Sequence, residues 1–181
     1  LDKINFSPAL SSEKQTAMNG GFRYAPATRI YIQFNNRFWE NESLNGWGNT
    51  DLPEEIWQPS WDMTGNTGVL MSYLRWSAAE DMDTLNQDER NNAVLNRWEN
   101  IFEGSINNFD KGVSKSWVLD EWSKGAWASP TTSQNETLNE SISEIEGRLH
   151  FAGEHASNDR GWMQGALFSG LRASTEIKNA N

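Results

Sequence analysis

The chain contains 181 residues, about the size of one average domain, and its hydrophobic fraction of 36% is sufficient for a packed core. Its formal net charge of -10 repels phosphate backbones and anionic membrane surfaces, so neither nucleic acid nor a membrane is an expected partner. The absence of cysteine excludes disulfides, thiolate catalysis and cysteine metal sites, and no segment reaches the roughly 18 consecutive apolar residues of a transmembrane helix.

The chain begins Leu1-Asp2-Lys3, without an initiator Met and without the charged-then-apolar pattern of a secretory signal. We expect it to be a mature product or a piece of a longer protein. Its N-x-S/T sequons are about as frequent as chance predicts, so a secreted and a cytoplasmic location both stay open.

A first strand is expected over 28–34, where polar and apolar residues alternate with period two. The alternation places Ile30, Ile32 and Phe34 on one face. The polar residues, Arg29 among them, lie on the opposite face.

A second strand is expected over 68–74, after an Asn- and Gly-rich loop over 41–50 and a turn over 64–67. The acidic pair Glu54 and Glu55 lies between loop and turn and is expected to be solvated surface.

A helix is expected from Asn86. Asn86 and Glu89 have the spacing of a capping box, apolar residues recur with helical period as far as Phe102, and Gly104 is typical of a stop.

The Ser-, Thr-, Asn- and Glu-rich segment 128–147 is expected to be an exposed loop, with Ile142 and Ile145 touching the core. A short strand is expected over 148–153. A final helix follows. One side carries Met163, Leu167, Leu171, Ser174 and Ile177, and another side is kept small by Gly165, Ala166, Ser169, Gly170 and Ala173.

Tryptophan is unusually frequent. Eight of the ten Trp residues lie between Trp39 and Trp122, which indicates either an aromatic-rich core or a ligand surface.

The segment from Gly153 to Ala166 is expected to present the N-terminus of the final helix to a ligand. Free N–H groups and the positive end of the helix dipole favour anionic or electron-rich groups there, and Gly161 and Gly165 let the backbone approach closely. The alternative is that the small residues serve only tight packing of a strand, a loop and a helix.

His150 and His155 lie on no common face of a strand or helix, so we expect no metal site at this pair.

Three strings follow one another near the C-terminus: Phe151-Ala152-Gly153-Glu154-His155, Gly161-Trp162-Met163-Gln164-Gly165-Ala166 and Ser169-Gly170-Leu171-Arg172-Ala173. Together they resemble the C-terminal flavin-binding signature of the flavin amine oxidases, especially the L-amino acid oxidases. The resemblance implies that the Glu154 carboxylate and the backbone of Gly161, Trp162 and Met163 contact FAD. Gln164, Gly165 and Ala166 continue that contact.

Four upstream segments resemble the same family in the same order: 29–40, which ends in Arg37-Phe38-Trp39-Glu40; Thr50-Asp51-Leu52-Pro53; 68–73; and 122–127. The resemblance implies that the Tyr73 hydroxyl binds the substrate carboxylate. It also implies that Trp127 and Trp162 flank the substrate side of the flavin ring. The expected catalytic residues are thus Arg29, Tyr73, Trp127 and Trp162.

Two positions depart from the family pattern. Arg29 stands where a Lys usually holds a water near flavin N5, and Arg is forked and stays protonated. Ala126 stands where some amine oxidases carry the Cys that bonds the flavin, so FAD is expected to bind non-covalently.

The Gly-rich G-x-G-x-x-G turn that holds the FAD pyrophosphate in this family does not occur in the sequence. The resemblance therefore implies a proteolytically processed enzyme whose N-terminal half is the partner of this chain. The assembled enzyme is expected to be a homo-oligomer.

The implied fold class is α/β (α+β), the C-terminal part of a two-domain flavin amine oxidase fold. It combines a mixed-sheet substrate domain with the closing strand and helix of the FAD-binding domain. Residues 1–115 are expected to form the substrate-domain portion and 116–181 the FAD-domain portion.

The implied reaction converts an L-amino acid, O2 and water to a 2-oxo acid, ammonia and hydrogen peroxide, with hydride transfer from the substrate Cα to flavin N5. Two alternatives stay open: an oxidase of an amine without a carboxylate, and a non-catalytic Trp-rich domain that stacks sugars on its indoles.

Overall fold

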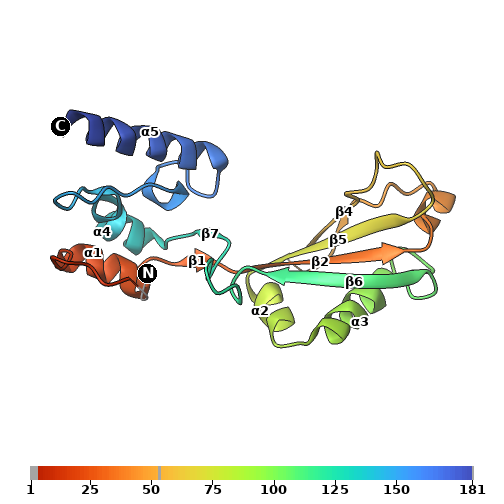
Figure 1. Cartoon of the computed structure of the whole chain (residues 1–181). Coiled ribbons are helices and arrows are strands. Elements are labelled where there is room, and N and C mark those ends of the chain that lie inside the picture. Colours follow the sequence, from red (N-terminus) through yellow and green to blue (C-terminus); the bar gives the residue numbers. More distant parts are fainter. Residues whose placement is uncertain (1–3, 53, 181) are drawn as a thin grey trace. The chain divides into compact units, whose positions relative to one another are not determined.

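The computed structural model describes residues 4–52 and 54–180 (Figure 1). The chain forms two compact units. We call Pro26–Ala126 the sheet unit, and Leu1–Ala25 with Trp127–Asn181 the helical unit.

The sheet unit is built on a five-stranded sheet in the order β3-β4-β5-β2-β6. Its strands are β2 (Ala27–Phe34), β3 (Gly48–Asn49), β4 (Glu54–Trp57), β5 (Gly68–Arg75) and β6 (Phe109–Ser116). The described strand pairs of this sheet are all antiparallel, rather than mixed as expected. Strand β2 runs against both β5 and β6, and β4 runs against both β3 and β5.

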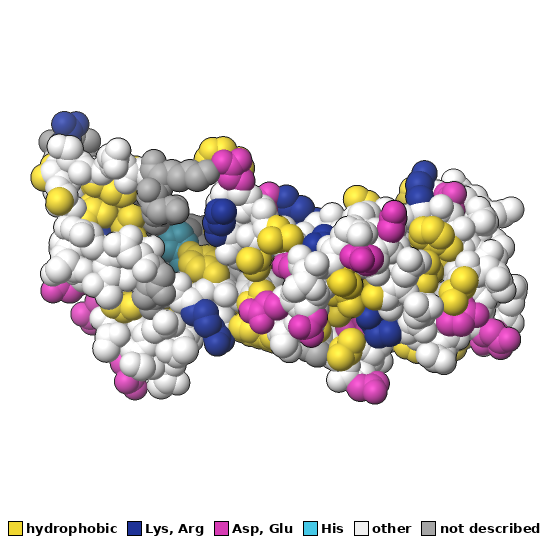
Figure 2. All heavy atoms as spheres, turned by 90° about the horizontal axis from the view of Figure 1, so that it is seen from below, with side chains coloured by type: hydrophobic (Ala, Val, Ile, Leu, Met, Phe, Trp, Pro, Cys, Tyr) yellow, Lys and Arg dark blue, Asp and Glu magenta, His cyan; other side chains and the backbone are white. Residues whose placement is uncertain are grey.

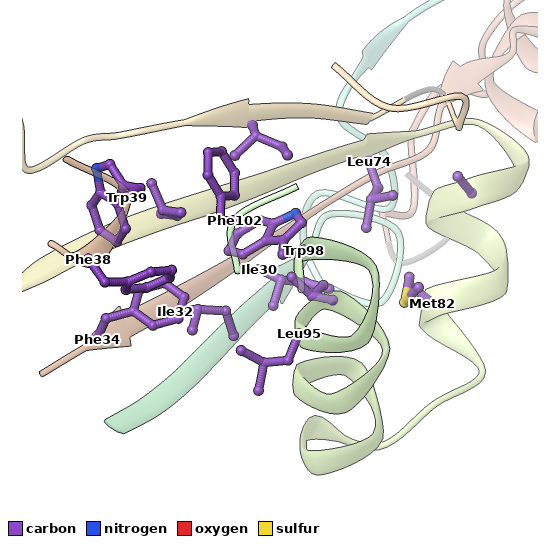
Figure 3. Close-up of a cluster of buried hydrophobic side chains, with 14 of the residues drawn as sticks. Ile30, Ile32, Phe34, Phe38, Trp39, Leu74, Met82, Leu95, Trp98 and Phe102 are labelled. Carbon is purple, nitrogen blue, oxygen red and sulfur yellow. The ribbon is translucent and has the colours of Figure 1, made fainter. Parts of the chain in front are cut away.

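The alternation along β2 separates a buried face from a partly exposed one, as predicted. Ile30, Ile32 and Phe34 are completely buried in the core, and Arg29 lies on the opposite face. The helices α2 (Ser77–Asp83) and α3 (Gln87–Trp98) and the short 3-10 helix η2 (Phe38–Glu42) complete this core (Figure 3).

Tryptophan serves both the core and the surface. Trp39 and Trp98 are fully buried in the core, where the Trp39 ring packs edge-on against Phe34. The other eight Trp residues are partly or fully exposed.

The predicted capping box of α3 is confirmed, since Asn86 and Glu89 exchange both hydrogen bonds. The helix ends at Trp98, earlier than Gly104. The Glu99 carboxylate accepts the N–H groups of Gly104 and Ile106, which turns the chain out of the helix.

The helical unit contains a two-stranded pair and several helices. Its elements are α1 (Ser12–Thr16), the π-helix η1 (Ala17–Gly21), β1 (Tyr24–Ala25), β7 (Trp127–Ala128), α4 (Thr132–Ser143), the 3-10 helix η3 (Glu154–Ala156) and α5 (Met163–Asn179).

The expected exposed loop over 128–147 is wrong, because α4 occupies most of it. Thr131 and Gln134 form a capping box at its start. Leu138 and Ile142, one turn apart, bury their side chains in the small core of the helical unit. Ile145 lies beyond the helix and is exposed.

The expected strand over 148–153 is also wrong. Its only strand-like pairing in the described chain is the bridge between Glu146 and Leu149, around a turn at Gly147. A strand needs a neighbouring strand to bond its N–H and C=O groups. In the described residues, the Gly153 N–H and the Phe151 carbonyl instead bond to the side chains of Ser169 and Arg172.

The expected final helix is confirmed as α5, and its two sides behave differently. The small residues Gly165, Ser169 and Ala173 are buried within the helical unit. The large apolar side is exposed, with Met163 at 80% and Leu167 at 72% of full exposure.

The boundary expected near residue 115 differs from the observed division at 25/26 and 126/127. The N-terminal segment groups with the C-terminal residues because Tyr24 and Ala25 pair with Ala128 and Trp127. The assignment of the two units to substrate and flavin binding stays a prediction.

On the face shown in Figure 2, Lys and Arg side chains are interspersed with acidic and hydrophobic ones and form no continuous basic patch. None of the helices in the described residues is long and apolar enough to span a membrane.

Candidate active site

Glu154 joins two segments of the helical unit. One carboxylate oxygen accepts the N–H of Ala128 at 2.8 Å, and the other accepts the N–H of Gly161 at 2.7 Å. The side chain therefore fixes the loop before α5 to strand β7.

Trp127 lies beside this loop. A Cβ atom at Gly161 would be 3.4 Å from Trp127 Cδ1, and Gly161 has a φ of 76°, a conformation that favours glycine. The structure thus brings Trp127, Glu154 and Gly161 together.

The N-terminus of α5 follows directly and is open. Trp162 is the N-cap residue, its side chain makes no capping hydrogen bond, and the first turn contains no acidic residue. Trp162 and Met163 are both largely exposed. An exposed, uncapped N-terminus of a 17-residue helix offers N–H donors and a positive dipole end to an electron-rich group.

Gly165 serves packing within the chain. A Cβ atom there would lie 2.1 Å from the carbonyl oxygen of Asp159, so only glycine lets α5 approach this segment. One turn later, the Ser169 hydroxyl accepts the N–H of Gly153 at 2.9 Å. Gly165 and Ser169 therefore serve tight packing within the chain, as the alternative interpretation expected, while the N-terminus of the same helix stays open. Contact of Gln164, Gly165 and Ala166 with a flavin stays a prediction.

Arg172 holds α5 to the segment that precedes it. Its guanidinium donates to the carbonyl of Phe151 at 2.7 Å and to the Glu176 carboxylate at 2.5 Å. His150 Nδ1 lies 3.1 Å from the other oxygen of Glu176. The hydrogen bonds from His150 and Arg172 lower the pKa of Glu176.

The two histidines have separate surroundings. His150 belongs to the network of Glu176, whereas His155 packs near the Tyr24 ring, and burial lowers the pKa of its imidazole. The described residues contain no group of three or more His, Cys, Asp or Glu side chains placed to hold a metal ion.

Tyr73 and Arg29 lie opposite each other on β5 and β2, on the sheet face turned away from the core. The Arg29 guanidinium carbon is 4.6 Å from the centre of the Tyr73 ring. The Trp57 ring meets Tyr73 edge-on, and Trp47 stacks on Trp57 with ring centres 5.6 Å apart. This face thus carries an aromatic wall next to a cation.

The neighbouring cations on this face are neutralised. Arg75 forms an ion pair with Glu55 at 2.6 Å, and Lys115 pairs with Asp120. Arg29 forms no ion pair within the described residues, and its buried Nε has no hydrogen-bond partner. Burial acts to lower the pKa of Arg29, but the hydroxyls of Tyr31 and Tyr73 outweigh it and raise the pKa.

Sequence reasoning missed Trp47 and Trp57 as parts of this wall. The signal was available, because β4 alternates: Glu54 and Ile56 are buried, while Glu55 and Trp57 lie on the opposite face. Recognising 54–57 as a strand would have placed Trp57 beside Tyr73.

The expectation that Glu54 is solvated is wrong. Its carboxylate is buried and accepts hydrogen bonds from Ser72 and from Thr50, the latter at 2.9 Å, and it pairs with Arg97 at 3.2 Å. Thr50 begins the Thr50-Asp51-Leu52-Pro53 segment, so Glu54 fixes the start of that segment; Pro53 lies outside the described residues.

Residues 1–178 match the family model of the flavin containing amine oxidoreductases. The chain belongs to this family. Membership of this flavin oxidase family implies a flavin cofactor, and the family gives no support to the sugar-binding alternative.

L-amino-acid oxidases are among the most similar curated relatives. One from Echis ocellatus is 29% identical, over 99% of this chain and 36% of the relative. One from Siganus canaliculatus is 33% identical, over 96% of this chain and 34% of the relative. The chain therefore spans about a third of the length of these relatives.

Solved flavin oxidases share the fold. A cyclohexylamine oxidase from Brevibacterium oxydans has a TM-score of 0.82 at 19% identity, and a redesigned putrescine oxidase has 0.86 at 18%. Each match covers 99% of this chain and 40% of the other chain. The expected fold class is confirmed, and the partial coverage agrees with the expectation that the chain is the C-terminal part of such an enzyme.

Proposed function

We propose that this chain is part of an FAD-dependent L-amino acid oxidase, which converts an L-amino acid, O2 and water to a 2-oxo acid, ammonia and hydrogen peroxide. The observation that carries the proposal is the Tyr73 phenol beside the Arg29 guanidinium on an aromatic face of the sheet. A hydroxyl donor next to a fixed positive charge suits a carboxylate, which separates an amino acid from a plain amine.

The residues of the helical unit fit a flavin. The uncapped end of α5 supplies backbone N–H donors at 163 and 164, and Gly161 adds no side chain that would block approach. When bound, the flavin supplies the hydride acceptor and the route to O2. Gly161, Trp162 and Met163 would hold it together with Glu154, and Gln164, Gly165 and Ala166 would extend the contact.

We propose that the cofactor is FAD and that it is bound non-covalently, since Ala126 offers no nucleophile for a bond to the ring. Both carboxylate oxygens of Glu154 already accept backbone N–H groups. This carboxylate therefore positions the loop around Gly161, and any contact it makes with FAD is additional.

The chain's own side chains orient the substrate. The Tyr73 hydroxyl donates a hydrogen bond to a carboxylate oxygen, and Arg29 supplies positive charge on the same side. On the helical unit, the exposed indole of Trp162 and the partly exposed indole of Trp127 are the aromatic side chains that we propose for the substrate side of the flavin ring.

The proposed partner is the N-terminal half of the same enzyme, within an assembled homo-oligomer. Two features support it: the sequence lacks the Gly-rich turn that binds the pyrophosphate, and the large apolar side of α5 is exposed (Met163, Leu167, Phe168 and Leu171). A contiguous apolar surface of this kind marks an interaction site. Proteolytic processing would account for two separate chains.

The test is expression of the complete enzyme that contains this chain, followed by three measurements. We expect a yellow protein, release of free FAD on acid denaturation, and peroxide production with L-phenylalanine but not with phenethylamine, the matching amine without a carboxylate. Preference for phenethylamine would contradict the amino acid assignment and favour the plain amine oxidase. Flavin retained after denaturation would contradict non-covalent binding.

A separate measurement tests the partner. The isolated chain is titrated with FAD alone and again with the N-terminal half present. We expect stable binding only in the second case, because the pyrophosphate turn comes from that half. Sub-micromolar binding by the isolated chain would contradict the need for a partner.

A further inference from the structure

Three cationic side chains lie in neighbouring positions on the outer face of the sheet unit. Arg29 on β2 is in register with Tyr73 on β5 and with Lys115 on β6, and Arg75 follows two residues after Tyr73. Since residues two apart in a strand share a face, these side chains form one polar layer.

The surrounding carboxylates are distributed unevenly among these cations. Glu55 neutralises Arg75 and Asp120 neutralises Lys115. Within residues 4–52 and 54–180, no carboxylate lies within ion-pair distance of Arg29, although it is the cation nearest to the Tyr73 ring.

The hydrogen bonding of Arg29 is also incomplete. Its Nε is shielded from water but donates to no acceptor in the described chain. An unmade hydrogen bond at a buried donor is costly unless a group from outside supplies the acceptor. The Arg29 guanidinium lies over the Tyr73 ring, 4.6 Å from its centre. A guanidinium and a phenol hydroxyl this close together supply donors for the two oxygens of a carboxylate.

We infer that Arg29 acts together with Tyr73 as a direct ligand of the substrate carboxylate and thereby determines the preference for carboxylate-bearing substrates. Arg29 thus has a role of its own in this chain, apart from the water-holding role that the resemblance implies for a Lys at this position. The inference rests on the proposed function, because it takes the substrate to be an amino acid.

The aromatic wall adds a second element of selection. Trp57 packs edge-on against Tyr73, and Trp47 stacks on Trp57. An apolar or aromatic substrate side chain is compatible with this surface, whereas a second charge on the substrate would face apolar rings. A phenylalanine-like carboxylate is therefore a suitable probe.

The experiment measures binding rather than turnover. The complete enzyme is titrated with 3-phenylpropionate, which keeps the carboxylate and ring of phenylalanine but has no amine to oxidise, and with the neutral 3-phenylpropionamide. Quenching of tryptophan fluorescence gives both dissociation constants. We expect the wild type to prefer the carboxylate.

Arg29→Met should weaken 3-phenylpropionate binding by about 10- to 150-fold, the range expected for a charge-assisted hydrogen bond, and leave the amide almost unaffected. Arg29→Lys keeps the charge but loses the forked guanidinium, so its dissociation constant for 3-phenylpropionate should lie between those of the wild type and Arg29→Met. It also keeps the test valid if Arg29→Met does not fold. Arg75→Met is the control, with a loss of at most about fivefold, because Arg75 belongs to a surface ion pair.

The inference is overturned if both Arg29 variants bind 3-phenylpropionate as tightly as the wild type, or if Arg75→Met weakens binding as much as Arg29→Met does. These outcomes are distinct from a failure of the proposed function. That failure would appear as absent flavin or absent oxidation of L-phenylalanine in the wild type, whatever the binding constants of the variants.

Discussion

Lys14 and Glu144 are 130 residues apart in the sequence and are joined by a 2.8 Å hydrogen bond from the Lys14 ammonium to the Glu144 carbonyl. The same ammonium donates to the carbonyl of Ile142 at 3.0 Å and lies over the Phe151 ring. Lys14 is thus buried where α4 ends, and it satisfies carbonyl groups that the helix leaves open.

Lys14→Met should lower the free energy of unfolding by about 1–3 kcal/mol, because the buried carbonyl of Ile142 and the partly buried carbonyl of Glu144 lose their donor. Urea denaturation followed by circular dichroism measures this change. Lys178→Met, at an exposed position near the end of α5, is the control and should stay within about 0.5 kcal/mol. Equal effects of the two variants would contradict the role given to Lys14.

Gly165→Ala should destabilise the chain by about 1–3 kcal/mol, since the new Cβ collides with the Asp159 carbonyl and forces a backbone shift. Gly170→Ala lies in the same helix with open space at its Cβ position. It should stabilise by up to about 1 kcal/mol through helix propensity. Opposite signs in the melting temperatures of the two variants are the expected result.

Glu154→Gln should loosen the loop before α5. A glutamine side chain offers one carbonyl oxygen where the carboxylate offers two, so either Ala128 or Gly161 loses its acceptor. We expect faster hydrogen exchange at one of these two amides and a lower flavin content of the complete enzyme. Glu136→Gln, on an exposed turn of α4, should change neither, and normal exchange in Glu154→Gln would contradict the positioning role.

Trp162→Ala should reduce turnover more than flavin retention. The contacts proposed for the flavin at this position come from the backbone, whereas the exposed indole is proposed to wall the substrate. Flavin content and steady-state kinetics of the complete enzyme separate the two effects. Loss of flavin with unchanged turnover per bound flavin would show a structural role instead.

The hydrogen bonds of Glu176 predict how the stability of the fold changes with pH. The hydrogen bonds from His150 and Arg172 lower the pKa of Glu176 from its ordinary value of 4.5. A carboxyl group whose pKa is lowered by folding stabilises the folded state at pH values above its ordinary pKa of 4.5. This stabilisation is lost as the pH falls through the lowered pKa of the folded state. The difference in melting temperature between wild type and Glu176→Gln should therefore be largest near neutrality and shrink below about pH 4.5. A gap that widens on acidification would contradict this assignment.

Strong local signals predicted the strands and helices that they cover. The alternation in β2 and the capping box of α3 each depend only on residues close together in the sequence, and the structure contains both. The helix α4 was missed because its polar composition hides a buried stripe of only Leu138, Ser141 and Ile142.

Other features depend on partners far away in the sequence. Nothing in the composition of residues 1–25 indicates that β1 pairs with β7 across about a hundred residues. The acidic pair in the sequence predicts that Glu54 is exposed, whereas strand β4 directs its side chain toward Ser72 and Arg97. The motif string around Glu154 suggested a site, but its two backbone hydrogen bonds emerge only from the folded loop.

The pairing of β2 with β5 has a consequence for how such an enzyme can change. The register that buries Ile30 and Ile32 is the same register that sets Arg29 opposite Tyr73, and a slip of one residue would exchange the two faces. Under the proposed function, inward positions of one strand therefore serve folding, and outward positions serve substrate binding. On that proposal, substrate preference can change by exchange at Arg29, Trp57 and Tyr73 while the inward residues stay the same, and a laboratory library restricted to these outward positions should yield folded proteins at high frequency.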